Sequence, residues 1–98
     1  MSIDEQIRQL EKRLSDWEAE MSELEAEIAA SDKDPKVKEG LLSELESLQA
    51  RRRTAGERLA ELRTREAESW ADDTLLTGIL EIFDDIGRRL DAVVSRAG

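Results

Sequence analysis

The residues most suggestive of chemistry are an acidic pair and a basic pair close together, Asp84-Asp85 and Arg88-Arg89. Two adjacent carboxylates invite a catalytic or a metal-binding interpretation, but no other residue nearby supports one. On a helix, Asp84 and Arg88 are four residues apart, as are Asp85 and Arg89, which is the spacing of intrahelical ion pairs. We therefore expect these four side chains to stabilise structure.

The chain also lacks the residue types on which most enzymes depend. It contains no histidine, the usual general base and the commonest metal ligand, and no cysteine, which excludes thiolate chemistry and disulfides. It has no glycine-rich phosphate loop, no nucleophile motif and no metal-ligand spacing. We expect a protein that is not an enzyme and that holds no metal and no cofactor.

The most one-sided charge feature is a run of six carboxylates with no basic residue among them: Asp16, Glu18, Glu20, Glu23, Glu25 and Glu27. Such a run either docks a basic partner or serves as an ordinary solubilising surface. The candidate partner-binding residues are Glu18, Glu20, Glu23, Glu25 and Glu27. Carboxylates spread along a helix do not make a calcium loop, which is a compact turn containing glycine.

Arginines concentrate further along the chain, at positions 51, 52, 53, 58, 63 and 65. Alone they would suggest phosphate binding, but the formal net charge of −9 disfavours binding to nucleic acids or to anionic membranes. We expect these arginines to pair internally, with Asp4, Glu5 and Glu11 among their partners.

The elements that carry these charges are predicted by apolar spacing. Eight apolar residues alternate at intervals of four and three: Ile3, Ile7, Leu10, Leu14, Trp17, Met21, Leu24 and Ile28. This interval leaves one narrow apolar seam, which is typical of a coiled coil. A helix over about 2–30 is expected.

A turn at 31–34 and a second helix over 35–69 follow. Asp34 is a favourable N-cap residue, and Pro35 suits the first helical position because its missing N–H is not needed there. The second seam is weaker than the first: Leu41, Leu45, Leu48, Arg52, Ala55, Leu59 and Leu62.

Residues 1–69 are predicted to fold into an antiparallel coiled-coil hairpin. If paired positions sum to about 66, Met21 lies beside Leu45 and the bulky Trp17 meets the Leu48–Arg52 step. In that register the Arg52 guanidinium would lie over the Trp17 indole.

The third segment, 70–98, has a broad apolar face rather than a seam. The joint at 66–74 contains no glycine or proline, so a continuous helix and a break both remain open, with a break or bend slightly favoured. Trp70, at this joint, either packs the third helix or lies exposed. Because a thin-seamed hairpin offers little complementary surface, the third helix is expected to form a homo-oligomer, a dimer or a tetramer. The expected interface residues are Leu76, Ile79, Phe83, Ile86, Leu90 and Val93.

The fold class predicted is therefore all-α, with a hairpin followed by an oligomerising amphipathic helix. The expected function is a non-enzymatic assembly or adaptor module that presents an acidic hairpin to a basic or helical protein partner. The alternative is a small acidic chaperone that sheathes an apolar helix of a client, and a membrane-surface protein is the weakest option. The start of the chain resembles no signal peptide, and no apolar run approaches the roughly 20 residues of a membrane span, so a cytoplasmic location is expected.

Overall fold

The computed structural model is all-helical over the residues that it describes, 3–64 and 74–97, with no strand among them. The three helices are α1 (Ile3–Ala30), α2 (Pro35–Arg63) and α3 (Thr74–Ala97). The helical fold class is thereby confirmed. Residues 65–69, also predicted to be helical, and Trp70 lie outside the described residues.

The turn between α1 and α2 has the predicted capping residues. The Asp34 carboxylate accepts a hydrogen bond from the Lys36 backbone N–H at 2.8 Å, and Pro35 is the first residue of α2. On the other side of the turn, the Ser31 hydroxyl donates to the Ile28 carbonyl at 2.8 Å. Both helix ends that border this turn therefore satisfy backbone groups locally.

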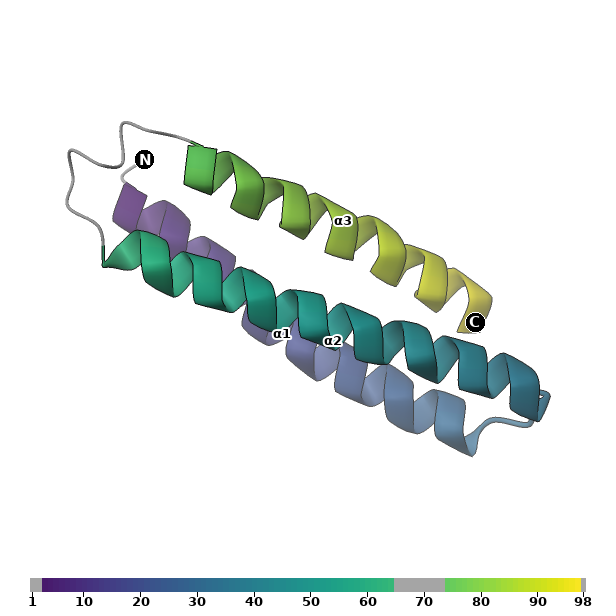
Figure 1. Cartoon of the computed structure of the whole chain (residues 1–98). Helices are drawn as coiled ribbons and strands as arrows, with labels where there is room; N and C mark the ends of the chain where they lie inside the picture. Colours follow the sequence, from purple (N-terminus) through teal and green to yellow (C-terminus); the bar gives the residue numbers. More distant parts are fainter. Residues whose placement is uncertain (1–2, 65–73, 98) are drawn as a thin grey trace.

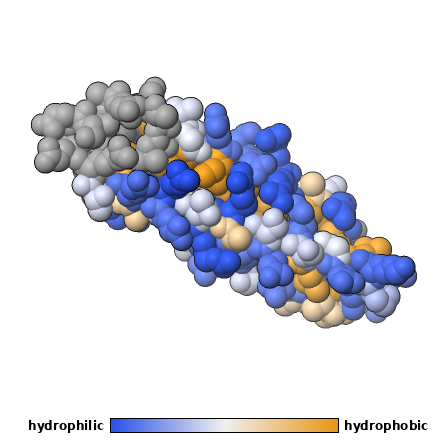
Figure 2. All heavy atoms as spheres, in the orientation of Figure 1, coloured by the Kyte–Doolittle hydropathy of each residue, from blue (hydrophilic) through white to orange (hydrophobic). Residues whose placement is uncertain are grey.

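The three helices form an elongated bundle of 53 × 18 × 18 Å (Figure 1). α2 runs antiparallel to α1 and α3 and lies against both, whereas the backbones of α1 and α3 approach each other much less. Most of the face visible in Figure 2 is hydrophilic, with apolar side chains in small separate patches.

The core consists of two apolar clusters, and each contains residues from all three helices. The cluster near the α1–α2 turn comprises Met21, Leu24, Ile28, Leu41, Leu45, Leu48, Ile86, Leu90 and Val93. The cluster at the other end comprises Ile7, Leu10, Leu14, Ala55, Leu59, Leu62, Ile79 and Phe83. Trp17 and Ile82 are partly buried and pack against both clusters, which joins them into one core.

The apolar face of α3 is covered by its own chain. Five of the six residues expected at an oligomer interface are at most 2% exposed: Ile79, Phe83, Ile86, Leu90 and Val93. Leu76, the sixth, is partly buried. α1 and α2 together offer α3 more apolar surface than their narrow seams predict, because residues of both seams also contact α3. The reason for expecting an oligomer is therefore removed.

The surroundings of Trp17 also differ from the prediction. Its ring lies 5.3 Å from that of Phe83, between centroids, and the guanidinium above it belongs to Arg13, with Cζ 4.8 Å from the ring centroid. Arg52, which was expected there, instead donates to Gln49 at 2.7 Å and pairs with Glu18 at 3.7 Å. The prediction was wrong because it lacked α3, whose Phe83 provides a second aromatic ring beside the indole.

The position of Phe83 yields a test of this core. Replacing Phe83, which is 2% exposed, with alanine removes a buried ring beside Trp17 and should lower the free energy of unfolding by about 3–5 kcal/mol. Leu80→Ala on the same helix is the matched control, because Leu80 is 43% exposed, and it should cost less than about 1 kcal/mol. Urea unfolding followed by circular dichroism measures both. Equal effects would contradict the packing of α3.

Candidate functional site

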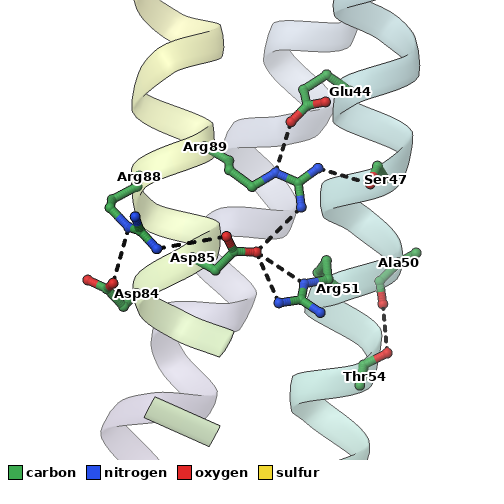
Figure 3. Close-up of polar contacts among 9 residues, drawn as sticks. All are labelled: Glu44, Ser47, Ala50, Arg51, Thr54, Asp84, Asp85, Arg88 and Arg89. Carbon is green, nitrogen blue, oxygen red and sulfur yellow. Dashed lines mark hydrogen bonds and ion pairs between the residues drawn. The ribbon is translucent and has the colours of Figure 1, made fainter. Parts of the chain in front are cut away.

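Asp85 and Arg89 of α3 form a polar cluster with Glu44, Ser47 and Arg51 of α2, which we call the clasp (Figure 3). Asp85 Oδ2 lies 3.0 Å from Arg51 Nη2 and 3.4 Å from Arg89 Nη1. Arg89 in turn donates to Glu44 Oε1 at 2.9 Å and to the Ser47 hydroxyl at 3.1 Å. Asp85 and Arg89 therefore link α3 to α2.

Asp84 and Arg88 form the predicted pair four residues apart, with Oδ2 and Nε 3.1 Å from each other. Both side chains are more than two-thirds exposed, so the pair adds little to stability. The structural interpretation of all four residues agrees with the geometry.

The clasp changes the titration of its members. Partial burial of Asp85 acts to raise its pKa, but the hydrogen bonds and positive charges of Arg89 and Arg51 outweigh burial and lower the pKa below its ordinary value of 3.8. The hydrogen bond to Glu44 is the main cause that raises the pKa of Arg89, against the opposing effect of burial. Both shifts favour the ionised forms of Asp85 and Arg89 in the folded chain.

A dependence of stability on pH follows for Asp85. Because its pKa is lower in the folded chain, this carboxylate stabilises the fold above pH values near 3.8, and the contribution is lost as the pH falls through the folded pKa. Asp85→Asn should cost about 1 kcal/mol at pH 7 and much less at about pH 3, measured by urea unfolding at both values.

Asp84→Asn is the control for this prediction, because the Asp84 side chain is 71% exposed. Its effect should be small at both pH values. An Asp85→Asn variant that is equally destabilised at both pH values would contradict the role given to the clasp.

The five predicted partner-binding carboxylates fall on different sides of α1. Glu18 faces α2, where it pairs with Arg52 at 3.7 Å, and Glu25 lines a surface groove formed mainly by α2. All five are exposed, and Glu20, Glu23 and Glu27 take part in neither of these contacts. These five carboxylates are close together in the sequence but lie on different sides of the helix.

Three of these residues continue a line that begins at Asp16. Asp16, Glu20, Glu23 and Glu27 follow one another at intervals of four, three and four residues, and all four are exposed. Such intervals keep side chains on one side of a helix. We name these four residues the acidic stripe, and over 11 residues it extends about 17 Å along α1. Asp16 has one neighbour of opposite charge, Lys12, at 3.7 Å.

Three arginines of α2 pair with carboxylates of the neighbouring helices. Arg63 pairs with Glu11 at 3.1 Å, in addition to the pairs that Arg52 and Arg51 make with Glu18 and Asp85. Internal pairing was expected for these arginines, and Glu11 is among the partners named. Arg65 lies outside the described residues.

The groove on the outer side of α2 has mixed character. Its lining combines the carboxylates of Glu25, Glu39 and Glu46 with the cationic Lys38 and Arg53. Lys38 already donates to the Ala29 carbonyl at 3.1 Å. Within residues 3–64 and 74–97, no group of three or more Asp or Glu side chains is arranged to hold a metal ion.

One feature that the sequence analysis missed is an exposed apolar edge on α3. Leu80 and Val94 are 43% and 39% exposed, and they stand 14 residues apart, with Gly87 midway between them. Because they are two heptads apart, both residues lie on one side of the helix, and this spacing can be recognised in the sequence.

Comparisons of the chain with family models, with curated proteins and with solved structures found no match. None of the helices in the described part of the chain combines the length and the apolar character that crossing a bilayer requires. The candidate site must therefore be judged on its own geometry and charge.

Proposed function

We propose that the protein is a non-enzymatic adaptor module that presents the acidic stripe of α1 to a basic protein partner. The observation that carries this proposal is that some carboxylates form ion pairs between helices, whereas those of the acidic stripe do not. Glu11, Glu18, Glu44 and Asp85 pair with arginines of another helix, whereas Glu20, Glu23 and Glu27 stay exposed along one side of α1.

Exposed carboxylates at this spacing suit recognition more than stability. Like charges three and four residues apart on a helix repel each other and slightly destabilise it. A cationic partner would relieve that repulsion and would be attracted from a distance, so the stripe favours fast association that weakens with salt.

The coiled-coil hairpin belongs to this proposal as the scaffold of the stripe. The burial of seam residues such as Met21, Leu45 and Leu59 supports it. So does the position of Gly56 against α1, where an added Cβ would lie in ordinary contact with Leu14 Cδ1, at 3.8 Å.

Self-association through α3 remains a competing prediction. Because Phe83 and Ile86 are already buried against α1 and α2, an oligomer that uses them would require α3 to be exchanged between chains. The chaperone alternative meets the same obstacle, since a client helix would have to displace α3 from the core. The adaptor needs no such opening, which favours it.

Replacing the exposed carboxylates tests the proposed function. The triple variant Glu20→Gln, Glu23→Gln and Glu27→Gln should lose the binding of partners captured by the immobilised chain from its native cell lysate, because neutral side chains no longer attract a basic surface. The matched control carries the same change at three exposed acidic residues of α2: Glu39, Glu46 and Glu57.

Capture that survives in the control, fails in the triple variant and weakens with added salt is the expected result. Partners retained equally by both variants would contradict the proposal.

A further inference from the structure

We propose that α3 is a releasable helix, which detaches from α2 as one cooperative unit while α1 and α2 stay paired. In this open form the apolar face of α3, which carries Phe83 and Ile86, becomes accessible to other molecules. Such an opening is the step that an exchange of α3 between chains would require. The inference does not depend on the binding of a partner to the acidic stripe.

The two outer helices, α1 and α3, have similar contacts with α2. The backbone of α2 approaches those of α1 and α3 to the same extent, whereas α1 and α3 approach each other much less (Figure 1). Among the residues whose burial is described, six apolar residues of α1 and five of α3 are buried. Because α1 and α3 approach each other little, the release of one leaves the backbone contacts of the other with α2 in place.

The two outer helices differ in their intrinsic helix stability. α3 contains Gly78 and Gly87, and a glycine in a helix interior is destabilising relative to alanine, whereas α1 contains no glycine. Seven of the 24 residues of α3 are β-branched, against three of the 28 residues of α1, and β-branched residues also favour the helix less. With similar contacts to α2, the outer helix of lower intrinsic stability detaches at the lower free energy, and that helix is α3.

Packing does not require either glycine of α3. In the described part of the chain, a Cβ added at Gly78 would meet no atom within 4 Å. One added at Gly87 would lie in ordinary contact with Trp17 Cζ2, at 3.9 Å. Both glycines therefore lower the stability of α3 although alanine would fit, a pattern that suits an element that opens.

The clasp is the polar contact that the release of α3 must break. Arg89 donates to Glu44 at 2.9 Å and to Ser47 at 3.1 Å, both on α2. The side chains of Arg89 and Glu44 are about a third exposed, so water can replace these contacts when α3 detaches. Release therefore leaves no buried charge without a partner, and the clasp contributes to the free energy that release requires.

Native-state hydrogen exchange of the full chain, followed residue by residue by nuclear magnetic resonance at low urea concentrations, tests the inference. The amides over 79–94 should exchange through one common opening, at a lower free energy than the amides at the centres of α1 and α2. This opening should also depend less on urea than global unfolding does, because it exposes less surface.

Gly78→Ala and Gly40→Ala form a matched pair. Gly78 is the fifth residue of α3 and Gly40 the sixth of α2, and an added Cβ at either position meets no described atom within 4 Å. Gly78→Ala should slow the exchange of the α3 amides about fivefold. Gly40→Ala lies on a helix that stays folded during the release, so it should slow only the amides that exchange by global unfolding.

A second pair of variants addresses the clasp. Arg89→Gln removes the contacts with Glu44 and Asp85 and should speed the exchange of the α3 amides about fivefold. Arg63→Gln is the control, since it removes an ion pair with Glu11 of α1, and should leave the exchange of α3 unchanged.

Equal slowing of the α3 amides by Gly40→Ala and Gly78→Ala would overturn the inference, because α3 would then open only when the whole chain unfolds. Exchange of the α1 amides at a lower free energy than those of α3 would overturn it as well. Neither result would alter the capture of partners by the acidic stripe. Loss of that capture would instead overturn the proposed function and leave the release of α3 standing.

Discussion

The burial of the apolar face of α3 is the interaction on which the rest of the structure depends. α1 and α2 contribute about two seam residues per heptad, and such a seam buries little area per residue. α3 supplies Phe83 to one core cluster and Ile86 to the other, so each cluster is completed by the third helix. Without α3, both clusters would be open on one side.

Charge is arranged around this core so that an acidic chain can fold. Arginines of α2 gather carboxylates from both neighbouring helices, as Arg63 does with Glu11 and Arg51 with Asp85. No polar or charged residue is buried among those whose surroundings are described, so these pairs stand at the edges of the core, where charges keep contact with water. On α1, four exposed carboxylates outside these interhelical pairs form the acidic stripe.

The sequence predicts α1 and the start of α2 well because both are local features. A seam interval of three and four and an Asp-Pro cap depend on neighbouring residues alone. The position of α3, in contrast, depends on contacts with residues far away in the sequence. A broad apolar face is equally compatible with self-association and with folding back, and the choice depends on the surface that α1 and α2 form together.

The same dependence on distant contacts applies to the arginine that lies over Trp17 and to the orientation of the glutamates on α1. Arg52 was expected over the Trp17 ring, but Phe83 of α3 lies beside the indole and Arg13 lies over both rings. The heptad phase separates Glu18 and Glu25 from Glu20 and Glu27, but which pair faces α2 depends on where α3 lies. For function, the sequence alone indicates an acidic surface and does not identify a partner.

The contact between Trp17 and Phe83 within one chain tests the central claim most directly. It can be measured by nuclear Overhauser effects between the two rings, first in a uniformly isotope-labelled chain and then in an equal mixture of labelled and unlabelled chains filtered for contacts between molecules. The account predicts strong Trp17–Phe83 effects in the first sample, since the ring centroids are 5.3 Å apart, and none in the filtered spectrum. Filtered effects between Trp17 and Phe83, or between two Phe83 rings, would contradict it and assign α3 to an oligomer.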